Sequence, residues 1–349
     1  MPGSPRCCAS SWPGSRRGPP LRSAVRRVLA WRWTRPLLSS AGGLLLLVYV
    51  IRSVPLADLG GHLRPQHPEP LVALLGLVLA AQLVRAVRWR CLLAPLARVA
   101  VVDAFWINAA SGFLNYVVPI RAGEAVRMLW LSRRHRVAPG TALGCLVMDH
   151  VCDLCGVILV LGTGALLAVT AAAQTPGLPT LLLALLGAVA MLALIAGTAR
   201  LGPWLARSRL VPGRFSHRIT GHALAFQAAT GLARTPDRVA LLAVSSATAT
   251  LCDGLAFAML LRSLGLGVSV VSAVVTQVTL LYATVLPSAP GYLGSLEAAG
   301  TFIMSHGLGL GAGSAAGAVL LWHAAGAAII LGVGALALVN LRGQFALRA

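Results

Sequence analysis

Five of the nine acidic residues in this chain of 349 lie inside apolar stretches, and these are the residues whose positions suggest chemistry. An ionisable group at membrane depth costs at least about 2.5–3.5 kcal/mol to insert, so it is a functional candidate by default. The sequence therefore predicts a polar site enclosed by apolar segments. The five residues are Glu124, Asp149, Asp153, Asp253 and Glu297.

The segment 117–127 combines a helix break with charge. Pro119 and Gly123 permit the break, after which a half-helix starts inside the protein and offers free N–H groups to an anion. Arg121 and Arg127 could hold a phosphate between them, with Glu124 on the same face orienting one guanidinium. The alternative is that both arginines extend to the head groups and only mark topology.

A second candidate group lies at 148–155, where Asp149 and Asp153 share one helical face because they are four residues apart. These carboxylates could bind a cation, pass a proton or pair with the arginines. Cys152 and Cys155 next to His150 suggest zinc, but no second Cys/His pair has ligand spacing, and buried thiols behave as small apolar groups. We expect neither a metal nor a cofactor.

The segment 286–297 repeats the pattern of a break followed by an acid. Pro290, Gly291 and Gly294 interrupt the helix, and Glu297 follows in the returning half-helix. Glu297 has no nearby arginine in the sequence, so it needs a partner from elsewhere or a proton. A role in substrate or ion coupling and a structural role both remain open, and His323 is a weaker candidate.

The composition requires a lipid environment. Apolar residues make up 57% of the chain and charged residues only 11%, whereas soluble domains carry about a quarter charged residues. The formal net charge of +20 comes from arginine alone, because the chain has no lysine. These arginines lie in short stretches between apolar runs, which is typical of topology signals and argues against nucleic-acid binding.

Eight apolar stretches position the candidate residues. Two of them, 101–134 and 270–304, are interrupted halfway by the breaks described above. The other six have the length of a membrane span. We predict these helices near 37–54, 70–88, 140–168, 178–199, 239–262 and 314–341.

The arginine clusters show how these stretches cross the membrane. Both 85–98 and 121–136 are basic, although a single apolar stretch separates them. A re-entrant hairpin over 101–134 keeps both clusters in the cytoplasm. The same argument makes 270–304 a hairpin that opens outside, which gives an inverted-topology repeat. Alternatively, Pro and Gly only kink ordinary membrane helices.

The predicted fold is therefore an all-α polytopic helix bundle with about six full spans and two re-entrant hairpins. Both termini are expected in the cytoplasm of a multi-pass cell-membrane protein. The expected organisation is a disordered Arg/Pro-rich leader (1–36), a membrane domain (37–341) with repeats 37–168 and 178–341 and a basic linker at 200–237, and a tail (342–349).

Three motifs resemble the flippase-like family, also called the lysylphosphatidylglycerol synthase transmembrane region. The run Pro119 to Arg127 is similar to its Pro-x-Arg-x-Gly-Glu-x-x-Arg stretch, and Asp149 to Asp153 to its Glu-Arg-x-x-Asp element. Its Pro-Gly-x-x-Gly-x-x-Glu element matches 290–297. The chain departs from the pattern at His150, where the family usually has Arg, and at Asp149, which replaces Glu.

The resemblance implies a helix bundle that moves or assists with amphiphilic lipids. In two-domain relatives this region flips aminoacylated phosphatidylglycerol, and a separate cytosolic domain, which we do not find here, makes that lipid. We expect a non-enzymatic transporter or flippase-like protein whose partners are anionic phospholipids or lipid-linked substrates. The alternatives are a non-catalytic component that works with cell-envelope biosynthesis enzymes or, less favoured, an intramembrane enzyme.

Overall fold

The computed structural model describes residues 64–118, 122–171, 236–283 and 289–346, together with four isolated positions before them. Throughout these ranges the chain is helical and contains no strand. The predicted helix 178–199 and the leader 1–36 lie outside the described residues, as do almost all of the predicted helix 37–54 and of the linker 200–237. The helices are α3 (Pro70–Leu93), α4 (Val101–Val117), α5 (Ala122–His135), α6 (Pro139–Ala171), α9 (Pro236–Ser263), α10 (Val270–Ala283), the 3-10 turn η2 (Pro290–Tyr292), α11 (Ser295–Gly307) and α12 (Ala312–Ala346).

Four helices of the described part are long and apolar enough to cross a membrane. They confirm the predicted helices near 70–88, 140–168, 239–262 and 314–341, although α12 continues to Ala346. A membrane span needs about 20 residues, so all four have sufficient length. The apolar segments are Pro70–Leu93, Pro139–Gly164, Asp237–Ser263 and Ala312–Arg342.

Both predicted interruptions are present. Helix α4 ends at Val117, and Val118 takes an extended conformation (φ −104°, ψ 121°), as expected for a residue that precedes proline. Helix α10 ends at Ala283, and α11 begins at Ser295, directly after a segment that contains Gly291 (φ 72°) and Gly294 (φ 87°). Glycine occupies these two positions because a side chain disfavours the left-handed region.

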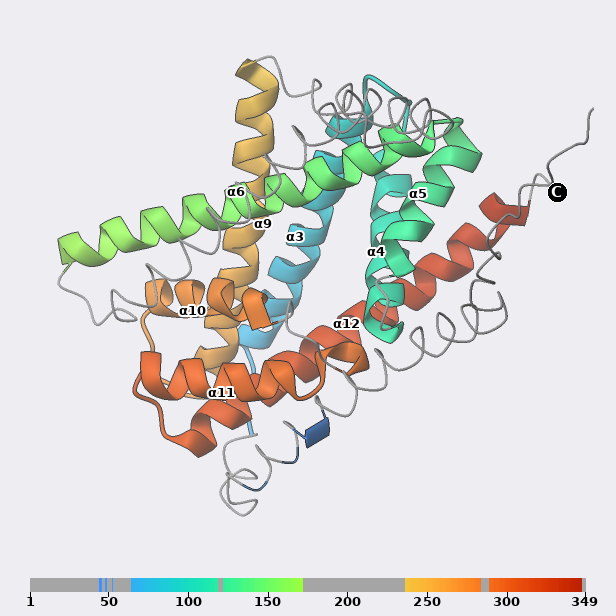
Figure 1. Cartoon of the computed structure of the whole chain (residues 1–349). Helices are drawn as coiled ribbons and strands as arrows, with labels where there is room; N and C mark the ends of the chain where they lie inside the picture. The colour runs from blue at the N-terminus through green and yellow to red at the C-terminus, as the bar shows by residue number, and fades with distance from the viewer. Residues whose placement is uncertain are drawn as a thin grey trace, which may run out of the picture.

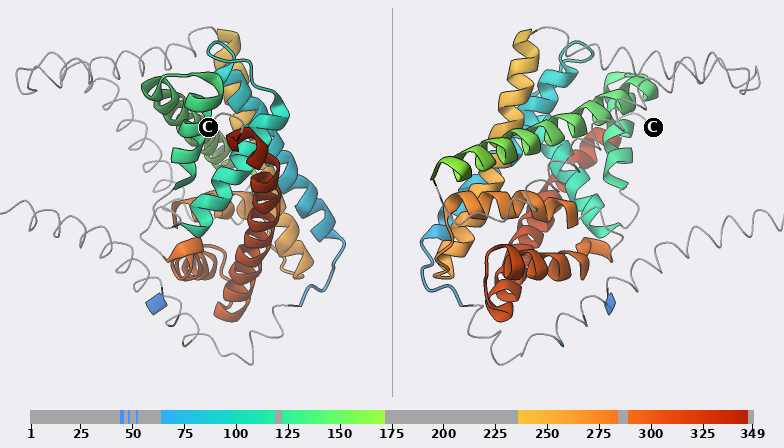
Figure 2. Two further views of the ribbon diagram at one scale, coloured as in Figure 1. Left: turned by 90° about the vertical axis from the view of Figure 1, so that its right-hand side faces the viewer. Right: turned by 60° about the vertical axis from the view of Figure 1, so that its left-hand side comes forward.

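Helices α3 and α9 run side by side through the middle of the molecule, and α6 slants across them (Figure 1). Helices α4 and α5 pack on each other, and α4 lies against the long α12. Helices α10 and α11 also pack on each other, and α11 lies against α12 (Figure 2). Each interrupted stretch thus forms a hairpin of two short helices: α4–α5 is the first hairpin, and α10–α11 is the second hairpin.

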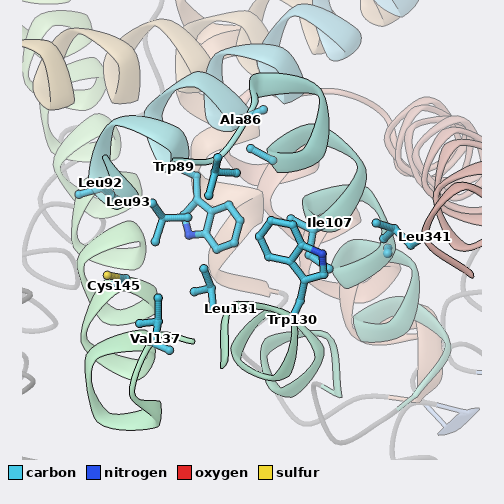
Figure 3. Packing of buried hydrophobic residues seen from close by; sticks show 14 of the residues in the cluster. Ala86, Trp89, Leu92, Leu93, Ile107, Trp130, Leu131, Val137, Cys145 and Leu341 are labelled. Atoms are coloured by element: carbon cyan, nitrogen blue, oxygen red, sulfur yellow. The ribbon is translucent and has the colours of Figure 1, made fainter. Parts of the chain in front are cut away.

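The packing has two main apolar clusters, one for each hairpin. The first joins α4 and α5 to the ends of α3 and α12, and it contains the buried rings of Trp89 and Trp130 with centroids 6.1 Å apart (Figure 3). The second joins α9, α10 and α11 to α12 and includes Phe257 and Met304. These clusters hold the helices of both hairpins against the long helices.

Candidate functional site

Arg88 is the centre of the largest charged cluster among the described residues, although it belongs to a membrane-spanning helix. It is 1% exposed on α3 and donates to Asp149 Oδ1 from both Nε (3.1 Å) and Nη2 (2.8 Å). The same Nη2 donates to Asp153 Oδ1 at 2.7 Å, and Nη1 donates to Ser246 Oγ at 3.2 Å. Charge-assisted bonds of this kind compensate the cost of burying the guanidinium.

Arg127 reaches the same carboxylate from the first hairpin. Its Nη2 donates to Asp149 Oδ2 at 2.8 Å, so Asp149 is shared between two arginines. The guanidinium lies over the Trp89 ring, with Cζ 4.3 Å from the ring centroid, a cation–π arrangement. Its Nε is buried without a hydrogen-bond partner. Helices α3, α5 and α6 therefore meet at one ionic junction.

Arg85 extends this junction to α9, where it pairs with Asp253. We call the six residues that these ion pairs involve the arginine–aspartate network. It contains three arginines and three aspartates, so it is neutral when all six groups are ionised. Its exposure is uneven, because the Arg88 side chain is 1% exposed and that of Asp153 is 48% exposed. Asp153 is therefore the accessible edge of a mostly buried network. The six residues are Arg85, Arg88, Arg127, Asp149, Asp153 and Asp253.

Glu124 lies beside the network but has partners of its own. It accepts two hydrogen bonds from Asn115 Nδ2 at 3.2 Å, and its Oε1 is 3.7 Å from His150 Nε2. Of the two arginines that Glu124 was expected to orient, Arg127 pairs with Asp149 instead, and Arg121 lies outside the described residues. The carboxylate is held by α4, and Arg127 turns instead toward α6.

The N-terminus of α5 is also partly occupied by the protein itself. The Gly123 amide donates to Asn115 Oδ1 at 2.8 Å, so this N–H is not free for an anion. A side chain at Gly123 would meet the Ser111 carbonyl oxygen at 2.1 Å, which explains why glycine is needed where α5 approaches α4. Arg121, the other predicted phosphate ligand, lies outside the described residues.

The second break forms a separate polar site around His323 of α12. Nδ1 is hydrogen-bonded to Glu297, while Nε2 lies 2.6 Å from the Gly291 carbonyl oxygen and 2.8 Å from Tyr116 Oη. The other carboxylate oxygen of Glu297 accepts from the Gly294 amide at 2.7 Å. Glu297 is 1% exposed, so this site is closed. The partner that Glu297 lacked in the sequence is His323.

The predicted site residues therefore fall into two groups. Asp149 and Asp153 join Arg127 in the arginine–aspartate network, with Gly123 and Glu124 beside it. Gly291, Gly294 and Glu297 belong to the second site, whereas Pro290 is exposed at the start of η2. Sequence reasoning assigned 85–98 to topology and missed Arg85 and Arg88. Their spacing of three residues at the end of a predicted span was the available signal. It also ranked His323 low and did not single out Tyr116.

A cavity of about 330 Å³ is lined by α6, α9 and α10, and the first two of these helices also carry Asp153 and Ser246. Its wall is apolar apart from two threonines. The dimensions suit part of an acyl chain rather than a polar group. The lining residues are Leu159, Val160, Thr163, Gly164, Val244, Ala247, Thr248, Leu251, Val271, Val274 and Val275.

A metal ion has no obvious place in the described ranges, where no three or more His, Cys, Asp or Glu side chains come together as ligands. Cys152 is buried and Cys155 is half-buried on α6. Each carboxylate of the arginine–aspartate network is paired with an arginine, so these acids hold guanidinium groups. The arrangement suits recognition of an anion better than metal chemistry.

Comparison with known proteins gives one match that covers most of the chain. Residues 34–334 match the family described as the lysylphosphatidylglycerol synthase TM region. No curated protein and no solved structure matches the chain. The matched range includes every residue of both sites described above, and it identifies the family of this protein.

Proposed function

This chain belongs to the lysylphosphatidylglycerol synthase TM region family, and from that premise we propose that it moves an anionic phospholipid or lipid-linked substrate between membrane leaflets. The observation that carries the proposal is the arginine–aspartate network, which places three guanidinium groups among apolar spans. Charged groups inside a membrane are costly and typically mark a substrate path. The protein is an integral membrane protein with several apolar helices.

The exposed edge of the network suggests how a head group binds. Arg88 is bonded to buried Asp149 on one side and to half-exposed Asp153 on the other. A phosphate that approaches from the exposed side competes with Asp153 for Arg88 while Asp149 keeps its two arginines in place. The guanidinium offers several donors in a fixed plane, which suits phosphate oxygens.

The neighbouring apolar cavity accommodates the other end of the substrate. It is formed by α6, α9 and α10, and the first two also carry Asp153 and Ser246 at the network. An acyl chain in this cavity could therefore remain in contact with apolar side chains while its head group lies at Arg88. Burial of methylene groups contributes about 0.8 kcal/mol each, so the cavity adds affinity without selecting the head group.

We further propose that the two hairpins belong to an inverted-topology repeat. Glu124 and Glu297 are each the third residue of the second hairpin arm, and each precedes a histidine by 26 residues. Those histidines, His150 and His323, both face the preceding glutamate. Equivalent positions in two halves are expected if each half has the same fold, and broken helices at the repeat interface are typical of transporters.

In this arrangement both termini are cytoplasmic, the first hairpin opens to the cytoplasm and the second opens outside. Single cysteines at the exposed positions Arg134 and His306 test the topology with an impermeant thiol reagent on intact cells. Labelling of position 306 but not of position 134 is expected. Labelling of both from the same side would contradict the inverted repeat.

Lipid movement is tested with the purified full-length chain in proteoliposomes. Fluorescent anionic lipids, including phosphatidylglycerol and its lysyl ester, are placed in both leaflets, and an impermeant reductant reports exchange between them. Arg88→Gln and Arg127→Ala are expected to reduce exchange at least tenfold, whereas Arg98→Gln, at an exposed position after α3, is the matched control. Equal exchange in all three variants would contradict the proposed site.

The chain is proposed to do this without catalysis, as a transport protein. If the purified protein leaves every lipid in its original leaflet, the result favours the alternative function, a non-catalytic role beside cell-envelope biosynthesis enzymes. Chemical modification of a lipid by the purified protein, detected by mass spectrometry, would instead indicate an intramembrane enzyme. The same vesicles therefore distinguish the three functions.

A further inference from the structure

We propose that Glu297 and His323 form a proton-binding site that controls how the tips of the two hairpins pack on each other. This proposal deepens the proposed function by naming a proton as the coupling ion. Only the role of the site in transport rests on that function. The site is fully enclosed, with Glu297 1% and His323 7% exposed.

The Gly291 carbonyl fixes the state of one imidazole nitrogen. A carbonyl oxygen can only accept, and it lies 2.6 Å from Nε2, so Nε2 carries a hydrogen. Tyr116 Oη, 2.8 Å from the same nitrogen, is the second group in reach of that hydrogen. A neutral imidazole with hydrogen on Nε2 has a lone pair on Nδ1, and that lone pair faces Glu297.

One further proton must therefore lie between Nδ1 and the Glu297 carboxylate. Both atoms carry lone pairs, and their close contact is stable only with a hydrogen between them. With this proton the pair is neutral overall, whether the proton belongs to the imidazole or to the carboxyl. Without it, a buried negative charge faces a lone pair, which is strongly unfavourable in an apolar environment.

The groups around the pair cannot replace the missing proton. The second carboxylate oxygen of Glu297 accepts a hydrogen bond from the Gly294 amide. Helices α4 and η2 contribute the neutral rings of Tyr116 and Tyr292. On the α9 side the residue next to His323, Trp322, packs against Phe257. Among the residues that the structure describes, the groups facing the pair therefore supply hydrogen bonds and apolar surface but no cation. Loss of the proton to water must separate Glu297 from His323 or draw water between them.

Such a separation would reach both hairpins because Tyr116 joins their tips. Tyr116 belongs to α4, directly before the first break, and its ring lies 6.2 Å from that of Tyr292 in the second break. An added Cβ at Gly291 would meet the Tyr116 ring at 3.0 Å, so the tips are in close contact. His323 bonds to both tips, through Gly291 and Tyr116. Proton occupancy is therefore coupled to the contact between the hairpins.

Spin labels next to the site test this coupling without any lipid transport. Genetically encoded spin-labelled amino acids replace Val117 and Leu293, which are exposed neighbours of Tyr116 and Tyr292. Electron paramagnetic resonance then measures the distance between them in the full chain in nanodiscs, over a range of pH. We expect the distance to increase when the proton is lost. A distance that is independent of pH overturns the proposal.

Two substitutions assign the response to the pair. Glu297→Gln replaces the carboxyl group with an amide, and His323→Gln removes the imidazole. Each substitution is expected to abolish the pH dependence of the distance between the spin labels. Glu124→Gln is the matched control, since Glu124 has the equivalent position in the first half, and it should retain the response. Retention of the full response in Glu297→Gln overturns the proposal.

Proteoliposomes with an imposed proton gradient then relate the site to transport. Exchange of the fluorescent lipid is expected to respond to the gradient in the unmodified chain and to lose that response in Glu297→Gln. If the labels respond to pH but no lipid moves, the proton site stands and the transport function fails. If lipid moves and the labels do not respond, the proton site fails and the transport function stands.

Discussion

The two hairpins place different chemistry at equivalent positions. The sixth residue of α5 is Arg127, which pairs with Asp149, whereas the sixth residue of α11 is Gly300, which packs against Val319. At this position the first hairpin contacts α6 through charge, and the second contacts α12 through close apolar packing. The comparison indicates that the same arrangement of two short helices can carry either an ion pair or an apolar contact at this position.

The equivalent glutamates differ in the same sense. Glu297 contacts His323 in a closed site, while Glu124 remains 3.7 Å from His150, whose side chain is 47% exposed. The first half is open at Asp153 and His150 and is suited to exchange partners with a ligand. The second half has no such opening at its pair. We infer that recognition belongs to the first half and the switch between states to the second.

The largest expected loss follows from removing the shared carboxylate of the first half. Asp149→Asn leaves Arg88 and Arg127 buried with a single remaining acid, half-exposed Asp153. Breaking a buried ion pair costs about 3–5 kcal/mol, so the thermal midpoint of the purified protein should fall strongly. Asp237→Asn, at an exposed position in the first turn of α9, should leave the midpoint unchanged.

A second substitution tests whether charge imbalance causes that loss. In Asp149→Asn combined with Arg127→Met, the two remaining charges of the junction, Arg88 and Asp153, are still matched. The double variant should therefore be more stable than Asp149→Asn alone, because interacting residues give non-additive effects. A double variant that is less stable than either single variant would show that shape, not charge, holds the first hairpin.

The close contact of the second half is tested at Gly300. Gly300→Ala would place a Cβ 2.7 Å from Val319 Cγ2 and 2.8 Å from its Cγ1, so α11 must move away from α12. Overpacking of this kind costs about 1–3 kcal/mol, measured as a lower thermal midpoint. Gly112→Ala, where nothing lies within 4 Å of the new Cβ, is the control and should be neutral or slightly stabilising.

A smaller effect is expected where charge is kept and only shape changes. Arg127→Lys retains a cation near Asp149 but loses the planar group that stacks on Trp89. We expect a loss of about 1–2 kcal/mol in thermal unfolding experiments, since lysine replaces neither the stacking nor the fork geometry. Arg133→Lys, exposed in the last turn of α5, provides the comparison; equal losses would rule out a special role of the Trp89 stack.

The elements of this fold were predictable because local chemistry determines them. Apolar runs of sufficient length gave α3, α6, α9 and α12, and the proline and glycine positions gave both breaks. These signals lie within a few residues of the structure they predict. The predicted inverted topology depends on the surrounding membrane. The predicted helices 37–54 and 178–199 lie almost entirely outside the described residues.

The partners in the sites were less predictable because they come from distant parts of the chain. Arg88 and Asp149 are 61 residues apart, and Tyr116 and His323 are 207 residues apart. An arginine near the end of a span has the same local sequence whether it reaches the head groups or an internal acid. The pairing of Arg88 therefore depended on the packing of α3 against α6, which no local pattern specifies.

The smallest effect on stability is expected at Glu124, and this residue sharpens the comparison most. Glu124→Gln keeps a side chain that can bond to Asn115 and removes only a partly exposed charge, so the loss should be below about 1 kcal/mol. Glu297→Gln replaces the acceptor of the buried His323 bond and should cost about 1.5–3 kcal/mol. The difference in thermal midpoint between the two variants measures how far the halves have diverged. Equal losses would mean that Glu124 is as enclosed in the membrane as Glu297, and recognition could then no longer be assigned to the first half alone.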